Sequence, residues 1–470
     1  MYQLPIDTFI NHQIVNSQIV NKMMNWKQLI SAKRFGMEEF HEERQENRSE
    51  FQRDYDRLIF SAPFRRLQNK TQVFPLPGSV FVHNRLTHSL EVASVGRSLG
   101  DDVAKALLER HPELQDSFLP EIGSIVSAAC LAHDLGNPPF GHSGEKAIST
   151  FFSEGKGVRL KEKQPNGEQL SPMEWEDLTH FEGNANAFRI LTHQFEGRRK
   201  GGFVLTYTTL ASIVKYPFSS SLAGTKSKFG FFVSEEESFH KIATELGLTL
   251  LNEHPLKYAR HPLVYLVEAA DDICYQMMDI EDAYKLKILT TEETKELLMA
   301  YFSEERQEHL RKTFLIVNDV NEQIAYLRSS VIGLLIRECT RVFLDHEQEI
   351  LSGTFEGSLI KRIAERPAAA YKHSVEVSIN KIYRSRDVLD VELAGFRIIS
   401  TLLELMIDAV TSPEKAYSKL LIDRVSSQYN INSPVLYERI QAVLDYISGM
   451  TDVFALDLYR KINGNSLPAV

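Results

Sequence analysis

Residues 131–145, with the sequence LAHDLGNPPFGHSGE, place two histidines and two acidic residues on either side of a break in the chain. His133 and Asp134 end an apolar segment of helical periodicity, whereas His142 and Glu145 follow two prolines. Imidazole and carboxylate groups are common ligands of divalent metal ions. A histidine beside a carboxylate is also a frequent pair for proton transfer. The segment therefore suits a metal centre with a proton-transfer pair next to it.

The break between the two pairs has the composition of a helix end. Gly136 suits the left-handed conformation that often follows a helix, and Pro138 and Pro139 cannot continue one. Ser143 is a candidate N-cap of the next helix. A single His-Asp dipeptide is more often a hydrogen-bonded core pair than a metal site. The metal hypothesis therefore requires ligands from other segments.

A second segment, residues 84–111, has the pattern of one long helix with Asn84 as its N-cap. Arg85 and His88 lie three residues apart and therefore share one face of this helix. Such a pair can belong to an ordinary surface. It can also hold a metal ion and the phosphate that the ion binds.

A third segment, residues 261–284, predicts a mostly apolar helix. Asp271, Tyr275 and Asp279 follow one another at intervals of four and form a single polar stripe on it. A carboxylate buried in such a helix must be paired or metal-bound, because an uncompensated buried charge is costly. Two imidazoles and two carboxylates suit a borderline divalent ion and leave coordination positions for water or substrate. The predicted metal ligands are His88, His133, Asp134 and Asp271.

The composition describes a globular chain of 470 residues with 43% hydrophobic residues and a net charge of −10. This charge argues against a surface devoted to nucleic acid, although an anionic substrate would still need a local basic cleft. The three cysteines show no CxxC spacing, and no apolar run approaches the ~20 residues of a membrane span. With no signal-peptide pattern at the N-terminus, we expect a cytoplasmic protein.

Helical periodicity dominates the chain, and no stretch alternates like a strand, so we predict an all-α fold. The expected organisation is an N-terminal tail at 1–25, a catalytic core with insertions at 26–290, and a helical region at 291–470 packed on the core. Residues 151–172 and 219–237 are rich in polar residues and are expected to form loops.

The wider sequence resembles the bacterial deoxyguanosinetriphosphate triphosphohydrolases (dGTPases), a family of HD-domain phosphohydrolases. The resemblance begins near Trp26 and continues almost to the C-terminus. The bare HD pattern is widespread, whereas PPFGHxGE combined with EAADDxxY is specific to this family. The motifs that carry the resemblance are RDYDRLIFSAPFRRLQNKTQVF, NRLTHSLEV, LAHDLGNPPFGHSGE, HFEGNANAFRI, KYP, KFGFF, EAADDICY and YISGMTDVFALDLY.

The resemblance implies hydrolysis of a deoxynucleoside triphosphate, with dGTP the first candidate, to a deoxynucleoside and inorganic triphosphate. It implies an HD-domain core and a divalent metal cofactor, which could be Mg, Mn, Ni, Co, Fe or Zn. His142 and Glu145 would be the catalytic pair, and the four ligands named above would bind the metal. The residues leave open whether His142 protonates the departing 5′ oxygen or assists the attacking water.

The same resemblance implies a set of substrate contacts. Arg85 and Lys215 would bind phosphates, since a triphosphate needs fixed positive charge in an acidic site. An aromatic side chain placed where a 2′-hydroxyl would project can select deoxyribose. For each of these residues the alternative is an internal hydrogen bond or ion pair. The implied contacts are Gln72, Arg85, Asn184, Asn186, Lys215, Tyr275 and Asp279.

The resemblance also implies a homo-oligomer and an effector, either a second dNTP or single-stranded DNA. The basic run at 198–200 could serve an effector, although a solvated loop is the more common role of such a run. One residue departs from the family pattern, because Val453 stands where an Arg is expected after GMTD. This departure leaves the function of the C-terminal region open.

Two other functions are compatible with the same residues. A different HD phosphohydrolase, such as a nucleotidase or a cyclic-nucleotide phosphodiesterase, would release a product other than triphosphate. A nucleotide-sensing or single-stranded-DNA-binding protein on the same fold would not hydrolyse nucleotides. An intact pair of His142 and Glu145 argues against the sensor, which has no need of both.

Overall fold

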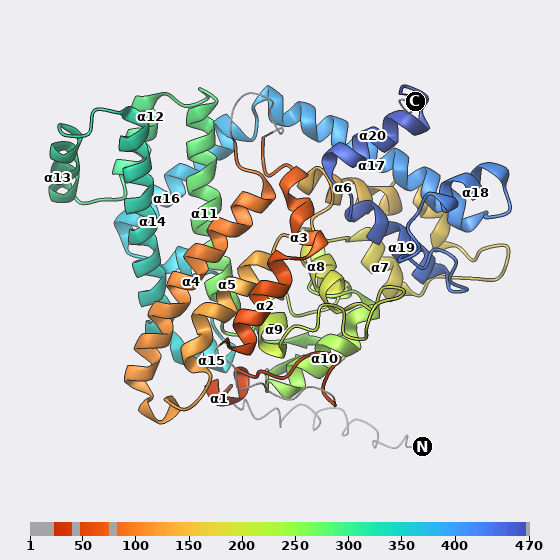
Figure 1. Ribbon diagram of the computed structural model, residues 1–470, viewed down its shortest axis with the longest axis horizontal. Coiled ribbons are helices and arrows are strands. Elements are labelled where there is room, and N and C mark those ends of the chain that lie inside the picture. Colours follow the sequence, from red (N-terminus) through yellow and green to blue (C-terminus); the bar gives the residue numbers. More distant parts are fainter. Residues whose placement is uncertain (1–22, 40–47, 75–81, 467–470) are drawn as a thin grey trace, which may run out of the picture.

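The fold consists almost entirely of α-helices (Figure 1). The computed structural model of the chain describes residues 23–39, 48–74 and 82–466. The all-α prediction is confirmed. The sequence pattern did not predict one small antiparallel sheet, in which β1 (Leu250–Asn252) pairs with β2 (Lys257–Tyr258).

Two helices at the centre of the fold position three of the predicted metal ligands. One carries His88, and the other ends just before His133 and Asp134. Helix α4 (Arg85–Arg110) packs along α5 (Ile122–Ala132), and both are lined with buried apolar residues. Gly100 permits this approach, since a Cβ there would lie 2.7 Å from the Cα of Gly123. Asn84 caps α4 as predicted, and its side chain accepts a hydrogen bond from the third residue of the helix.

The other helices of the N-terminal half surround this pair. Helix α2 packs against α5, and α11 packs across both α4 and α5. Their bounds are α1 Trp26–Leu29, α2 Glu50–Ile59, α3 Ala62–Arg66, α6 Gly141–Ser153, α7 Pro172–Thr179, α8 Gly183–Thr192, α9 Tyr207–Ile213, α10 Glu236–Glu245 and α11 Val264–Lys285.

The C-terminal helices cover two opposite sides of this core (Figure 1). Helix α14 packs on α4 and α11 at one side, while α17 lies along α6 at the other and contacts α18, α19 and α20. The buried apolar residues form two hydrophobic cores, and residues after 290 contribute to each of them. Their bounds are α12 Thr291–Met299, α13 Glu304–Phe314, α14 Val320–Asp345, α15 Glu347–Ser352, α16 Glu365–Val377, α17 Arg386–Thr411, α18 Ala416–Asp423, α19 Leu436–Ser448 and α20 Asp452–Ile462.

A buried charge network joins the two halves of the chain. The guanidinium of Arg189 on α8 pairs with Asp445 on α19 at 2.8 Å and with Glu235 at 2.6 Å. All three side chains are at most 5% exposed. Removal of one partner from a buried pair typically costs about 3–5 kcal/mol, so this network fixes α8 against α19.

The two segments expected to be loops contain more structure than the polar composition predicted. Residues 151–172 include the end of α6 and a 3-10 helix at Lys156–Lys161, and they lead into α7. Three short 3-10 helices lie within 219–237. Tertiary contacts order these segments, since Leu160, Phe229 and Phe232 are fully buried in the core next to α6 and α17.

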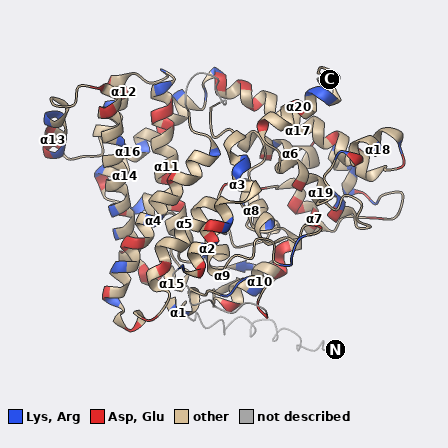
Figure 2. Ribbon diagram, viewed as in Figure 1, with Lys and Arg blue, Asp and Glu red and all other residues tan. Residues whose placement is uncertain are grey.

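Acidic and basic residues are interspersed on the exposed faces of α4 and α14 (Figure 2). This mixed pattern is typical of solvated helix faces. Within the described ranges, no helix is long and apolar enough to cross a membrane.

Candidate active site

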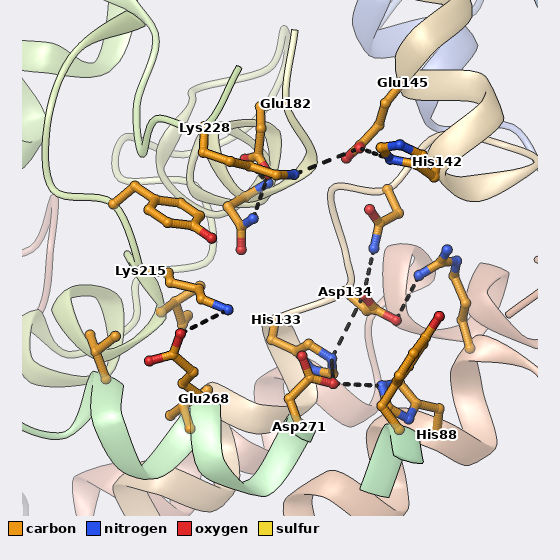
Figure 3. Close-up of a pocket in the computed structure, with 18 of the residues that line it drawn as sticks. His88, His133, Asp134, His142, Glu145, Glu182, Lys215, Lys228, Glu268 and Asp271 are labelled. Atoms are coloured by element: carbon orange, nitrogen blue, oxygen red, sulfur yellow. Dashed lines mark hydrogen bonds and ion pairs between the residues drawn. The ribbon is translucent and has the colours of Figure 1, made fainter. Parts of the chain in front are cut away.

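A cavity of about 320 Å3 lies where α4, α11, the α5–α6 turn and the start of α8 meet. Two groups of side chains face each other across it (Figure 3). His88, His133 and Asp271 lie on one side, and His142 and Glu145 lie on the other. The structure thus brings the two predicted groups, which come from three separate segments, to one site.

Three of the four predicted metal ligands converge, and the fourth, Asp271, contacts both of their imidazoles. The Nε2 atom of His88 lies 3.0 Å from Oδ1 of Asp271. The Nε2 atom of His133 lies 3.6 Å from the same oxygen and 3.7 Å from Oδ1 of Asp134. One ligand atom from each of His88, His133 and Asp134 falls within 4.8 Å of the others. These residues form a group that could hold a metal ion.

The bonding of His133 fits a metal ligand. Its Nδ1 lies 2.6 Å from the carbonyl oxygen of Cys130, and this bond requires the proton on Nδ1. The other ring nitrogen, Nε2, is buried and makes no hydrogen bond to any residue that the structure describes. In the neutral ring its lone pair faces two carboxylates, and a cation between them would replace this repulsion with attraction.

Charge keeps both carboxylates in the ionised form that a metal requires. Burial alone would raise the pKa of Asp271, but the adjacent charge of His133 and the close contacts with both imidazoles hold that pKa well below its usual value. Burial also opposes ionisation of Asp134, and the charge of Arg85 outweighs it and lowers the pKa. Arg85 donates a hydrogen bond from Nη1 to Asp134 Oδ2 over 2.8 Å.

The same charges shift the pKa of His133 in the opposite direction. Burial opposes the charged ring, but Asp134 and Asp271 outweigh it and raise the pKa of His133 to about 9. Without a metal ion, a proton would therefore occupy this ring at neutral pH and partly compensate the carboxylates. Protonation and metal binding compete for the same nitrogen.

His142 and Glu145 form an asymmetric pair at the mouth of the cavity. The Nδ1 atom of His142 lies 3.4 Å from Glu145 Oε2, and the histidine side chain is 81% exposed while the glutamate is buried. The hydrogen bond to Glu145 raises the pKa of His142. Burial opposes the charge of Glu145, but its bond to His142 and the charge of Lys228 lower its pKa. An exposed imidazolium held by a buried carboxylate is equipped to exchange a proton with a bound substrate.

The turn between α5 and α6 differs from the prediction in two details. Gly136 is not in the left-handed region; a glycine is required there because a Cβ would lie 2.0 Å from the carbonyl oxygen of Gly183. Ser143 is not the N-cap, since α6 begins at Gly141 and the left-handed residue Phe140 precedes it. The Ser143 hydroxyl instead donates to the carbonyl of Glu392 on α17. Tertiary contacts rather than local capping set this helix start.

Two lysines on neighbouring loops add positive charge to the cavity. Lys215 pairs with Glu268 at 3.1 Å, and burial of its ammonium is outweighed by this acidic neighbour, which raises the pKa of Lys215. Lys228 lies 2.5 Å from Glu182 and 3.9 Å from Glu145. Each lysine therefore has a resident carboxylate as its counter-charge (Figure 3).

Nine residues that line the cavity were not among the predicted site residues, and five of these carry a charged, amide or phenol group. Lys228 and Tyr216 belong to the motifs KFGFF and KYP, so the resemblance contained a signal for them. Glu268 lies one helical turn before Asp271, a spacing that places both on one face. Asn137 and Glu182 also lie in quoted motifs, LAHDLGNPPFGHSGE and HFEGNANAFRI, but their residue types alone do not distinguish a cavity position from an ordinary turn or helix cap. The five residues are Asn137, Glu182, Tyr216, Lys228 and Glu268.

Most predicted substrate contacts lie at the cavity. The Oε1 atom of Gln72 and the Nε atom of Arg85 are buried and have no hydrogen-bond partner among the described residues, as expected of groups that meet a ligand. Tyr275 packs edge-on against His88, with ring centroids 6.2 Å apart. The predicted contacts that line the cavity are Gln72, Arg85, Asn184, Lys215 and Tyr275.

Asn186 and Asp279 are not among the residues that line the cavity. Asn186 is buried and donates a hydrogen bond to the carbonyl of Gly136 over 2.7 Å. Asp279 accepts one from the Tyr383 hydroxyl over 2.5 Å, and burial raises the pKa of Asp279 to about 8. In this structure both support neighbouring elements, so direct contact with substrate stays a prediction.

Comparison with known families defines the class of the protein. Residues 85–197 match the HD domain, and this range contains the pair His133 and Asp134. Residues 363–461 match the phosphohydrolase-associated domain, which extends from α16 almost to the end of α20. The chain is therefore an HD-domain phosphohydrolase.

Similarity to curated proteins extends over nearly the whole chain. A deoxyguanosinetriphosphate triphosphohydrolase-like protein of Synechocystis is 38% identical over 94% of this chain and all of its own length. One of Pseudomonas aeruginosa is 37% identical over 95% of this chain and all of its length. The deoxyguanosinetriphosphate triphosphohydrolase of Yersinia enterocolitica is 30% identical over 93% and 99%, respectively. This chain belongs to the deoxyguanosinetriphosphate triphosphohydrolase family, as its motifs predicted.

The metal site can be tested directly by substitution of one ligand. We expect Asp271→Asn to weaken binding of a divalent ion by more than the ~10- to 100-fold that loss of an outer-shell partner causes. The matched control is Asp272→Asn, because Asp272 is on the same helix but is not among the residues that line the cavity. Metal content per chain, measured by plasma emission spectroscopy after dialysis, should fall only in Asp271→Asn. Equal metal content in both variants would remove Asp271 from the ligand set.

Proposed function

We propose that this protein hydrolyses deoxynucleoside triphosphates, dGTP first among them, to the deoxynucleoside and inorganic triphosphate. The observation that carries the proposal is the meeting, in one cavity, of a ligand group for a metal, a proton-transfer pair and three cations. The relatives named above support the same substrate class through their names. The cation groups are Arg85, Lys215 and Lys228.

We propose that a divalent ion is required and that His88, His133, Asp134 and Asp271 hold it. When bound there, such an ion supplies Lewis-acid polarisation of a phosphate oxygen. The mixed nitrogen and oxygen donors suit Mn, Fe, Co, Ni or Zn, and Mg is also a candidate. Its identity is a matter for measurement on the purified protein.

In the proposed reaction, water adds to the α-phosphorus and the bond from that phosphorus to the 5′ oxygen breaks. One proton must leave the water and one must reach the 5′ oxygen. We assign this proton transfer to His142, and its contact with Glu145, which favours the charged form of the ring, supports the assignment. Glu145 is itself fixed, because its Oε1 accepts the backbone N–H of Gly183 over 2.8 Å.

The basic side chains would bind the triphosphate. Arg85 stands between Asp134 and the start of α6, where its guanidinium can reach a phosphate held near the ligand group. Lys215 and Lys228 would each exchange a resident carboxylate for a phosphate oxygen. Fixed positive charge of this kind stabilises charge that develops on the leaving triphosphate.

Deoxyribose selection would depend on Tyr275. The ring lies against His88 on one side and is 6.3 Å from the ring of Tyr383 on another. These contacts hold it in place, so a ribose 2′-hydroxyl that projected toward it would meet a fixed aromatic face. Gln72, with its buried unpartnered oxygen, would contribute a hydrogen bond to the sugar.

A second cavity supports the proposal of an effector. It measures about 460 Å3 and is lined by Arg57, Arg66, Arg198, Arg199 and Tyr429. Guanidinium groups beside an aromatic face suit the phosphate and base of a nucleotide. We propose that a dNTP or single-stranded DNA binds there, and that two members of the predicted basic run take part.

We also propose a homo-oligomer. Leu389 and Leu393 on α17 are 44% and 72% exposed, which offers apolar surface for a second copy. Val453, which replaces the expected Arg, is 59% exposed at the start of α20. Any function of the expected Arg at that surface is absent from this chain.

Product analysis tests the proposed reaction. The purified protein should convert at least one dNTP to deoxynucleoside and triphosphate in the presence of Mn or Mg, as resolved by ion-exchange chromatography. Each dNTP is tested alone, with a second dNTP, and with single-stranded DNA. In His142→Ala, turnover should fall by at least the ~10²–10⁴-fold of a lost general acid or base, with metal content retained.

The other outcomes separate the competing functions. Monophosphate with pyrophosphate, or stepwise loss of phosphate, would assign the protein to another class of HD phosphohydrolase. Absence of turnover in every mixture would favour a nucleotide sensor. Normal turnover by His142→Ala would exclude His142 from the reaction.

The pH dependence of kcat/KM tests the pairing of His142 with Glu145. Glu145 raises the pKa of His142 above its ordinary value of 6.5, so Glu145→Gln should lower it. The limb of the profile that reports His142 should therefore move to lower pH. A shift of the alkaline limb would identify His142 as the acid, and a shift of the acidic limb would identify it as the base. Glu154→Gln, at the exposed end of α6, is the control; identical profiles for the two variants would contradict the pairing.

Sugar discrimination tests the position of Tyr275. Steric exclusion of an added hydroxyl gives selectivity of roughly 10²-fold, and Tyr275→Ala should lose most of it. The measurement is the ratio of kcat/KM for dGTP to that for GTP. Tyr275→Phe keeps the ring and should keep the ratio. A ratio that stays unchanged in Tyr275→Ala would assign deoxyribose selection to another residue.

A further inference from the structure

One carboxylate from the C-terminal region reaches two segments of the active site. Asp452, the first residue of α20, is 6% exposed. Its Oδ1 accepts the backbone N–H of Phe140 over 2.9 Å. Its Oδ2 accepts both the backbone N–H of Thr71 over 2.8 Å and the Thr71 hydroxyl over 2.5 Å. These partners lie more than 300 residues before it in the chain.

Helix capping does not account for this arrangement. An acidic residue in the first turn of a helix is favourable near the N-terminal dipole. Yet Thr451 already caps α20, since its side chain accepts the N–H of Phe454 over 3.1 Å. The carboxylate of Asp452 instead accepts hydrogen bonds from donors outside its own helix, at Phe140 and Thr71.

Phe140 needs such an acceptor. Its φ is 61°, a left-handed conformation that residues with side chains rarely adopt and that persists only where the surroundings hold it. Gly395 on α17 also restrains Phe140, because a Cβ at Gly395 would lie 2.5 Å from the Cβ of Phe140. His142 follows two residues later. The peptide at Phe140 therefore sets the direction in which α6 begins and the position of the proton-transfer pair.

Thr71 leads to the other side of the cavity. The next residue, Gln72, lines the cavity with its buried, unpartnered oxygen. The residue before it, Lys70, is also buried, and its Nζ donates to the carbonyls of Asn137 over 2.5 Å and Ser448 over 2.8 Å. Lys70 is thus bonded to the catalytic turn at Asn137 and to the end of α19 at Ser448, while Thr71 is bonded to the start of α20 at Asp452.

We propose that Asp452 is a positioning residue that holds His142 and Gln72 in one common geometry. The proposal rests on the proposed function, in which His142 moves the proton and Gln72 contacts the sugar. It assigns to the phosphohydrolase-associated domain a direct part in shaping the active site. Asp452 does not line the cavity. It therefore acts through its bonds to Phe140 and Thr71 and through its negative charge near Arg85 and Lys70.

The first experiment compares Asp452→Ala and Asp452→Asn with the control Asp457→Asn. Asp457 is on the same helix and forms an ordinary surface pair with Lys461. In Asp452→Ala, kcat for the best dNTP should fall by the order of ~10²-fold that a misplacement of about 1 Å causes, and KM should rise. Metal content should stay at the wild-type value, because His133 and Asp134 precede the turn. Asp457→Asn should match the wild type.

A cycle with Gln72→Ala separates positioning from a general loss of structure. If Asp452 acts on KM through Gln72, Asp452→Ala should raise KM no further in the Gln72→Ala background, within about twofold, while its effect on kcat persists. If KM of the double variant rises by the product of the two separate effects, the proposed action of Asp452 on Gln72 is wrong. If folded Asp452→Ala has the kcat of the wild type, the proposed action of Asp452 on His142 is wrong. A loss of kcat fully matched by lost folded fraction or lost metal would mean that Asp452 is only structural.

Asp452→Asn keeps the proposal testable if the alanine variant does not fold. The amide preserves size and one acceptor, but its NH2 group would face the donors of Thr71, so an intermediate loss of kcat is expected. The results also separate failure of this positioning role from failure of the proposed function. A loss of kcat in Asp452→Asn with normal turnover by His142→Ala would retain the restraint on the turn but reject the role given to His142.

Discussion

The centre of this structure depends on the compensation of buried negative charge. Asp134 and Asp271 face one point at the junction of α4, α5 and α11, the same helices that form the main hydrophobic core. Removal of two carboxylates from water is costly unless positive charge accompanies them. Two imidazoles, one guanidinium and a site for a cation supply that charge. Packing of the core excludes water from these carboxylates, and the proposed chemistry needs them ionised. Both therefore require positive charge beside them.

The active site is assembled by both halves of the chain. The HD domain supplies His88, His133, Asp134 and the pair of His142 and Glu145, and α11 supplies Asp271. The C-terminal helices hold the turn before α6 and the start of α6 by accepting the backbone N–H of Phe140 and the hydroxyl of Ser143. These contacts join residues far apart in sequence, and no local preference would produce the left-handed start of α6. The associated domain is consequently part of the site and not only a cover for it.

Sequence patterns predicted the helices and the chemistry better than the supporting contacts. Helices α4, α8 and α11 have clear periodicity or caps, and the ligands on them have distinctive residue types. Asp279 shows a limit of such patterns. At about 100° per residue, a side chain eight positions after Asp271 has turned by about 80°, which directs it to Tyr383 and away from the cavity. Lys228 lies in a loop without periodicity and Glu182 is the N-cap of α8, so their roles at the cavity follow from tertiary contacts and not from a periodic pattern.

The two lysine pairs at the cavity have a consequence for the end of the proposed reaction cycle. Lys215 and Lys228 are already neutralised by Glu268 and Glu182 in the structure described above. A polyphosphate can bind only by exchange with these two carboxylates, and a ligand with several charges competes for both lysines at once. A nucleoside without phosphates cannot compete for either. Return of the glutamates to their lysines would then favour departure of the inorganic product and restore the cavity for the next substrate.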